Sequence, residues 1–202
     1  MSPRAYRSVQ RAQRSRHTRE RILNAAKTLH ARHGILATSW EAIAREAGVA
    51  TATAYRHFPS LAELLPACAA SVFNTAGMPT LEQATAIFAG ARTPAARLER
   101  LIRGTCECYA RGEGWLNAAR RERELVAAVR DAVERQRQSV ETLVRSALAG
   151  SRVEARTVKA ITALVDFPFW RSLSDSGLGR RDSEDLIVSL VRSTLARRRG
   201  GS

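Results

Sequence analysis

The sequence is poor in several kinds of residue, and each shortage excludes a class of protein. Its three cysteines, Cys68, Cys106 and Cys108, form neither a disulfide framework nor a C-x-x-C redox motif, which favours small buried residues in a reducing compartment. No apolar run reaches the roughly 18 residues that a membrane span needs, and the basic N-terminus lacks the apolar segment of a signal peptide. We therefore expect a cytoplasmic protein without a membrane span, a metal or a cofactor.

Histidine is scarce, and the groups that usually carry catalysis are missing. All four histidines, His17, His30, His33 and His57, lie in the first 60 residues, so the longer remainder of the chain has none. Paired carboxylates in a shared segment, a glycine-rich phosphate loop and a nucleophile elbow are also absent from the sequence. General acid–base chemistry in the remainder is disfavoured, and we expect no enzymatic activity.

Basic residues, in contrast, are abundant and are concentrated near the N-terminus. The chain has 33 lysines and arginines against 19 acidic residues, a net charge of +14, and only Lys27 and Lys159 are lysines. Residues 1–60 hold 11 bases and 3 acids, a charge of +8, which leaves +6 for residues 61–202. A surplus of this size predicts attraction to polyanions such as nucleic acids.

The sequence pattern is helical from end to end. Alternating β-branched runs are absent, Ala, Leu, Arg and Glu dominate, and the hydrophobic content of 45% suffices for a core. We predict an all-α fold with three parts: a flexible basic arm over residues 1–15, a three-helix DNA-binding domain over 16–62, and a larger helical domain for ligand binding and dimerisation over 63–199.

Capping signals divide the N-terminal part into short helices. The first helix is expected over about residues 18–33. The second begins at a Thr38-x-x-Glu41 capping box and ends at Gly48, and a third covers residues 51–58. Two short helices joined by a tight turn form a helix-turn-helix unit, whose second helix enters the major groove of DNA.

The third predicted helix begins with small residues. Thr51, Ala52 and Thr53 have little to bury, so the backbone of this helix can approach DNA closely. Threonine hydroxyls can bond bases or phosphates, and their methyl groups can touch a thymine methyl. A helix that packs only within its own domain is the alternative interpretation of this segment.

The same helix ends with an aromatic and basic cluster. Tyr55 and His57 can donate hydrogen bonds to phosphates, and Arg56 can make a bidentate contact to guanine or a strong contact to phosphate. Ala54 and Phe58 are expected to face inward and hold the helix on its neighbours. The alternatives are a packing role for Tyr55 and a plain surface position for His57.

Beyond residue 78 the expected helices are longer. Thr93 caps a helix with Pro94 in its first turn, and Gly112 and Gly114 are expected to interrupt it. The next helical pattern carries one apolar stripe, made of Leu125, Val129, Val133, Val140, Val144 and Leu148. Its length predicts a break somewhere inside.

Residues 19–65 resemble the DNA-binding domain of a known family. The stretch RERILNAAKTLHARHGILATSWEAIAREAGVATATAYRHFPSLAELL is similar to that of the TetR (tetracycline-repressor) family through Ile22-Leu23-x-Ala25-Ala26, Gly34, Ala47-Gly48-Val49 and Tyr55-x-His57-Phe58. The resemblance implies a homodimeric all-α transcription regulator, usually a repressor, that a small ligand releases from a palindromic operator. It places the DNA contacts at Ser39, Trp40, Thr51, Ala52, Thr53, Tyr55, Arg56 and His57.

Two positions depart from the family pattern. Leu61 stands three residues after Phe58, where the family often has a lysine that binds phosphate, and the basic arm is a candidate to compensate. Trp40 occupies a site usually held by threonine or valine. It either meets a sugar edge or packs inside the domain.

The C-terminal part resembles the family more loosely. The stretch DFPFWRSL, residues 166–173, and the last amphipathic helix look like the dimerisation end of one TetR subgroup, which gives the expected interface residues Phe167, Trp170, Leu186 and Leu190. For the two aromatics, a core position or a place in a ligand cavity is the alternative. A hydrophobic effector is expected, with cavity candidates Phe73, Phe88, Cys106, Tyr109, Trp115 and Leu125, for which ordinary core positions are the alternative.

A second interpretation of the whole chain stays open at this point. The basic arm favours a nonspecific, architectural DNA-binding protein that has no inducer. Such a protein would show a steep dependence on salt and little preference between sequences.

Overall fold

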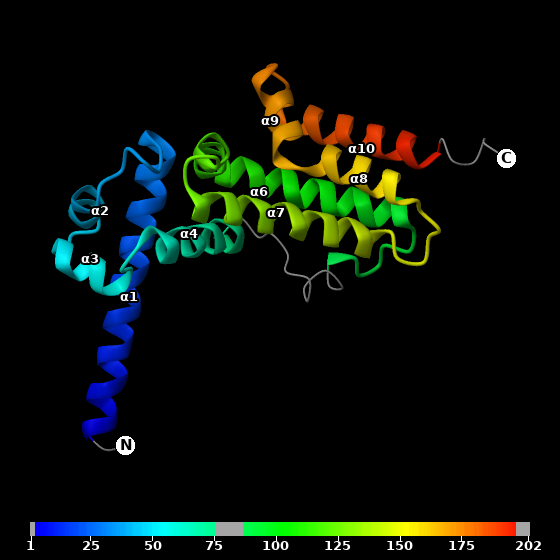
Figure 1. Ribbon diagram of the computed structural model, residues 1–202. Coiled ribbons are helices and arrows are strands. Elements are labelled where there is room, and N and C mark those ends of the chain that lie inside the picture. The colour runs from blue at the N-terminus through cyan, green and yellow to red at the C-terminus, as the bar shows by residue number, and fades with distance from the viewer. Residues whose placement is uncertain (1–2, 76–86, 197–202) are drawn as a thin grey trace. The chain divides into compact units, whose positions relative to one another are not determined.

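The computed structural model describes residues 3–75 and 87–196, and these residues form nine helices and no strand. The predicted all-α fold is therefore confirmed (Figure 1). The helices are α1 (Pro3–His33), α2 (Trp40–Glu46), α3 (Thr51–His57), α4 (Leu61–Thr75), α6 (Pro94–Glu122), α7 (Ala127–Ala147), α8 (Ala155–Val165), α9 (Phe167–Asp175) and α10 (Arg180–Ala196). None of these described helices has both the length and the apolar character required to cross a bilayer.

The chain forms two compact units. The N-terminal unit comprises Met1–Val72 and Gly114–Ala132, and the C-terminal unit comprises Phe73–Glu113 and the segment from Val133 onward. Helices α6 and α7 each contribute residues to both units. The domain boundaries at 15/16 and 62/63 that the sequence favours remain predictions.

Helix α1 is longer than the sequence analysis predicts. It begins at Pro3, so the expected start near residue 18 is wrong, and the segment expected to be a flexible arm is helical. Arginine, alanine and glutamine, which dominate this segment, are good helix formers, and proline is tolerated in a first helical turn. The expected stop at Gly34 is confirmed, since its N–H donates to the His30 carbonyl (3.0 Å) and its φ is 95°.

Of the two short helices, α2 has a side-chain N-cap, whereas the N-cap of α3, Ala50, makes no side-chain hydrogen bond. Ser39, rather than Thr38, is the N-cap of α2, because its hydroxyl accepts a hydrogen bond from the Ala42 N–H (3.1 Å). The predicted capping box is therefore one residue out of register. The Thr38 hydroxyl instead donates to the Gly34 carbonyl (2.6 Å), which closes the turn that follows α1. Helix α3 begins at Thr51, as predicted, and ends at His57, one residue earlier than predicted.

Helix α6 runs without interruption past two glycines. Gly112 and Gly114 lie inside it, so the predicted interruption is wrong, and the chain breaks instead between Glu122 and Ala127. A Cβ atom at Gly114 would lie 2.8 Å from the Ala31 Cβ, so the glycine allows α6 to approach α1 closely. The break also places Leu125 in a turn with 70% of its surface exposed, which removes it from the predicted apolar stripe.

This close approach leads to a prediction for two glycines of the same helix. Gly104 lies in α6, and outside its own helical turns no described atom lies within 4 Å of its ideal Cβ. Gly104→Ala is therefore expected to raise the free energy of unfolding by about 0.5–1 kcal/mol through helix propensity. Gly114→Ala gains the same propensity but must push α1 away, and it is expected to be less stable than Gly104→Ala by about 1–3 kcal/mol. Urea unfolding of both variants measures the difference. Equal stabilities would show that the two helices do not touch at Gly114.

The N-terminal unit buries one histidine completely. The side chain of His30 in α1 is inaccessible to solvent, and no described residue forms a hydrogen bond with either ring nitrogen. Burial lowers the pKa of His30 from 6.5 to about 4, an effect that the negative charge of Glu122 partly opposes. The folded chain therefore keeps this imidazole neutral at pH values where the unfolded chain protonates it.

We expect this histidine to make the protein unstable in mild acid. His30 is protonated below about pH 6.5 in the unfolded state but only below about pH 4 in the folded state. The free energy of unfolding therefore decreases as the pH falls from 6.5 to 4. The loss attributable to His30 is about 2 kcal/mol by pH 5. Urea unfolding at pH 7 and pH 5 should show a smaller loss in His30→Leu than in the wild type, while the exposed-site control His33→Leu should behave like the wild type. Identical losses in all three proteins would contradict this account.

The C-terminal unit is built around an aromatic cluster. Helix α10 packs against α8 and α9 (Figure 1), and the Tyr109 hydroxyl of α6 donates to the Val165 carbonyl at the end of α8 (3.0 Å). The centre of the Tyr109 ring lies 5.5 Å from the centre of the Phe167 ring and 5.9 Å from that of the Trp170 ring. Phe167 and Trp170 are buried within the chain, which agrees with their alternative interpretation as core residues. Their place in a dimer interface remains a prediction.

Candidate nucleic-acid interface

Helix α3 is held by two side chains that point into the N-terminal unit. Ala54 and Phe58 have 0% of their surface exposed, which confirms the prediction that they face inward. The guanidinium carbon of Arg19 lies 4.2 Å from the centre of the Phe58 ring. This cation–π contact fixes the C-terminal end of α3 against α1.

The remaining residues of α3 are accessible to a partner. Thr51, Thr53 and His57 are partly exposed, while Ala52 and Arg56 are exposed and Tyr55 shows 42% of its surface. The accessible side chains are therefore small at the start of the helix and polar, aromatic or basic towards its end. This is the arrangement that the sequence predicts, although contact with DNA itself remains a prediction.

The first residues of α2 adjoin α3. Ser39 is exposed at the N-cap of α2, and Trp40 follows it as the first helical residue. The Trp40 ring packs on the Tyr55 ring, with their centres 4.8 Å apart and their planes 33° from parallel. Trp40 is partly exposed and packs on a neighbouring helix, and the contact ties α2 to the accessible side of α3, while its contact with DNA remains a prediction.

Arg21 of α1 stabilises the turn between α2 and α3, a role that the sequence pattern does not reveal. Its Nε donates to the Ala47 carbonyl (3.0 Å), and its Nη2 donates to the carbonyls of Ala47 and Gly48, the latter at 2.8 Å. Gly48 has a φ of 62°, which glycine adopts readily. Arg21 thus caps the C-terminal end of α2 and sets the direction in which the chain enters α3.

Positive charge surrounds the C-terminal end of α3. Partial burial, followed by the charges of Arg56 and Arg19, lowers the pKa of His57 below its ordinary value. At neutral pH the ring is therefore uncharged, with one N–H donor and one acceptor nitrogen. Arg7, Arg11 and other arginines in the first half of α1 add further exposed positive charge to the same unit.

The effector candidates are divided between the two units. Phe88, Cys106 and Tyr109 are buried in the C-terminal unit, whereas Trp115 is buried in the N-terminal unit. Leu125 is 70% exposed, and the side chain of Phe73 lies outside the described residues. Burial raises the pKa of Cys106 to about 12, and Tyr109 is committed to the aromatic cluster, so these two behave as core residues.

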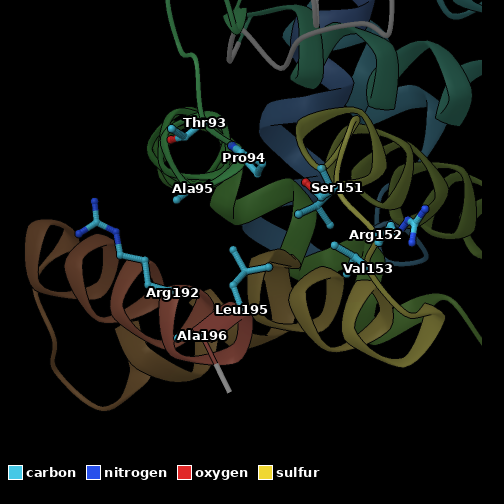
Figure 2. Close-up of a pocket in the computed structure, with 10 residues that line it drawn as sticks. Thr93, Pro94, Ala95, Ser151, Arg152, Val153, Arg192, Leu195 and Ala196 are labelled. Carbon is cyan, nitrogen blue, oxygen red and sulfur yellow. The ribbon is translucent and has the colours of Figure 1, made fainter. Parts of the chain in front are cut away.

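A pocket of about 600 Å³ lies elsewhere in the C-terminal unit (Figure 2). Its lining comes from the start of α6, the segment after α7 and the end of α10, namely Thr93, Pro94, Ala95, Leu148, Ser151, Arg152, Val153, Arg192, Leu195 and Ala196. Figure 2 places the guanidinium groups of Arg152 and Arg192 at opposite ends of the pocket. Arg192 pairs with Glu99 (2.6 Å). Most of the other lining residues are apolar, so the wall of the pocket is mainly apolar. The five candidates with described side chains are not among these lining residues, which come from segments far apart in the sequence.

Metal chemistry receives no support from the described residues, since no group of three or more His, Cys, Asp or Glu side chains there could hold an ion. The accessible polar groups of α3 are two hydroxyls, one guanidinium, one imidazole and one phenol. These are donors suited to phosphates and base edges.

Comparison with known proteins gives a consistent result. Residues 22–68 match the model of the family described as "Bacterial regulatory proteins, tetR family", and a comparison with curated protein sequences finds no significant match. Among solved structures, a TetR-like transcriptional regulator from Rhodococcus sp. RHA1 is 21% identical with a TM-score of 0.68, and the match covers 89% of this chain and 96% of the other.

Two further structures share the fold along most of its length. NalD, the secondary repressor of the MexAB-OprM multidrug efflux pump in Pseudomonas aeruginosa, is 21% identical with a TM-score of 0.67, over 90% of this chain and 97% of its own. The multidrug binding protein EbrR, complexed with imidazole, is 20% identical with a TM-score of 0.65, over 87% and 93% of the two chains. At these identities the likeness establishes the fold.

Proposed function

We propose that this protein is a sequence-specific DNA-binding transcriptional regulator of the cytoplasm. The match of residues 22–68 to the family model and the shared fold support this proposal. The observation that carries the proposal is α3: Ala54 and Phe58 anchor it, while Thr51, Ala52 and Thr53 leave its first turn slim and accessible. A helix of this shape fits the major groove, where its N-terminal residues meet base edges.

In the proposed complex, some residues of α3 contact base edges and others contact phosphates. Thr51 and Thr53 contact base edges or nearby phosphates, and Arg56 supplies the strongest single contact, to a guanine or a phosphate. Tyr55 and His57 donate to phosphates, which sets the register of the helix on the duplex. Ser39 lies at the N-terminus of α2, where a hydroxyl and backbone N–H groups can bind a further phosphate.

We propose that the protein acts as a homodimer on a palindromic operator. Two copies would present their α3 helices to successive major grooves, about 34 Å apart along the duplex. Leu186 of α10 is 37% exposed and Leu190 is partly exposed, so both retain apolar surface for a second copy. Helical homodimer interfaces are commonly formed by apolar residues on facing helices.

We propose further that a small hydrophobic effector releases the DNA, so that the protein serves as a repressor. The names of NalD, a repressor, and EbrR, a multidrug binding protein, support this proposal for a chain of the same fold. The pocket at Thr93–Ala95 is a candidate effector site, because its wall is mainly apolar and it lies against the first residues of α6. An effector that favours the non-binding state by a few kcal/mol suffices for release.

A nonspecific DNA-binding function is the second candidate, favoured by the net charge of +14 and the exposed arginines of α1. Sequencing of the genomic DNA fragments that the purified full chain retains distinguishes the two functions. Regulation of specific genes predicts recovery of one recurrent inverted repeat with half-sites one helical turn apart. Recovery of fragments without a shared sequence would support the nonspecific function and contradict the proposal.

A further inference from the structure

We propose that Glu122 is a positioning residue for DNA binding, an inference that rests on the function proposed above. Its carboxylate accepts hydrogen bonds from two consecutive backbone N–H groups in the turn that joins α1 to α2. Oε1 accepts from Ile35 (3.0 Å) and Oε2 accepts from Leu36 (2.7 Å). We call this arrangement the Glu122 clamp.

The clamp is specific to a carboxylate in this place. Both oxygens are used, one for each N–H, and hydrogen bonds to a charged acceptor are stronger than those to a neutral one. Gly34 makes room for it, because a Cβ atom at this residue would lie 2.4 Å from Oε1. A glutamine would retain one acceptor oxygen and turn an NH₂ group towards the other N–H, so it would hold only part of the turn.

From the clamp, a short series of contacts leads to the accessible surface of α3. Within the clamped turn, Thr38 bonds back to Gly34 through its hydroxyl (2.6 Å), and the next residue, Ser39, caps α2. Trp40, the first residue of α2, packs on Tyr55 of α3 (4.8 Å between ring centres). The position of the clamped turn therefore determines where α2 begins and where the Tyr55 ring lies.

The clamp also joins parts of the chain that are far apart in sequence. Glu122 is the last residue of α6, a continuous helix whose first residues, Pro94 and Ala95, line the pocket of the C-terminal unit. The turn that it holds belongs to the segment that the family model covers. Glu122 itself lies outside that segment, which is why the family pattern does not identify it.

The test compares Glu122→Ala, Glu122→Gln and the control Glu124→Gln in the full-length chain. Glu124 is exposed and two residues away, so its substitution removes the same charge without touching the turn. Amide hydrogen exchange is followed at Ile35 and Leu36, and DNA affinity is measured for the recovered operator at a temperature at which circular dichroism shows every variant to be folded. The exchange measurement tests the clamp even if the wild type binds no specific sequence.

For Glu122→Ala we expect exchange at both amides to become at least roughly tenfold faster and operator affinity to fall roughly tenfold, because two charge-assisted hydrogen bonds are lost. Glu122→Gln should recover part of both effects, and Glu124→Gln should remain within about twofold of the wild type in both. Faster exchange with unchanged affinity would overturn the positioning role, as would an equal loss of affinity in Glu124→Gln. Failure of the wild type to prefer any sequence would overturn the proposed function instead.

Discussion

The variant Thr53→Glu is expected to lose at least about 100-fold in affinity for the operator while it folds like the wild type. Thr53 is partly exposed on α3, so a longer side chain has room in the free protein. In the complex its carboxylate would be held among phosphates and base edges, while Arg56, three residues further along α3, is committed to a guanine or a phosphate. Burial of an unpaired charge at an interface costs about 2–5 kcal/mol, and 100-fold corresponds to about 2.7 kcal/mol.

Thr142→Glu is the matched control for this prediction. Thr142 is exposed on α7, its hydroxyl donates to the Gln138 carbonyl four residues earlier, and its replacement changes the net charge by the same amount. Fluorescence anisotropy with a labelled duplex at one salt concentration measures both variants, and circular dichroism verifies that both are folded. Equal affinities for Thr53→Glu and Thr142→Glu would mean that α3 does not enter the groove.

The second large effect is expected on stability, from Gly34→Ala. The φ of 95° at Gly34 is unfavourable for alanine, which costs about 1–3 kcal/mol. The added Cβ would also collide with Oε1 of Glu122, so the carboxylate must move and the turn loses its two hydrogen bonds. Together these effects are expected to lower the free energy of unfolding by about 3 kcal/mol.

Gly150→Ala separates the two contributions. Gly150 has a similar φ of 82°, but no atom lies within 4 Å of its ideal Cβ, so only the backbone cost applies. Urea unfolding should therefore show a loss for Gly34→Ala that exceeds the loss for Gly150→Ala by about 1–2 kcal/mol. If the two variants are destabilised equally, the Glu122 clamp contributes nothing to stability.

Features that depend on neighbouring residues were predictable from the sequence. Small residues followed by an aromatic and basic cluster predict the accessible side of α3, and the spacing of Ala54 and Phe58 places them on the opposite side. The start of α1 also depends on neighbouring residues. The sequence analysis nevertheless predicts a flexible arm over residues 1–15, because this segment has little apolar surface to bury. Propensity alone was sufficient for a helix there, as α1 shows.

Features that depend on distant residues were not predictable. Nothing near Gly114 in the sequence reveals that it meets Ala31, so a glycine that permits close helix packing was interpreted as a break. Glu122 bonds residues 86 and 87 positions away, and a lone glutamate at a helix end gives no local signal of that role. Phe167 and Trp170 suit a core and an interface equally well, and only their contact with Tyr109 identifies them as core.

The central claim is that the accessible side of α3 distinguishes one DNA sequence from others. It is tested most directly by the affinity of the full-length wild type for the recovered inverted repeat and for a scrambled duplex of equal length and base composition, at a single salt concentration. We expect a preference of at least about 1,000-fold for the repeat, which is typical of specific recognition. Equal affinities for the two duplexes would contradict the account and leave only attraction between the arginines and phosphates.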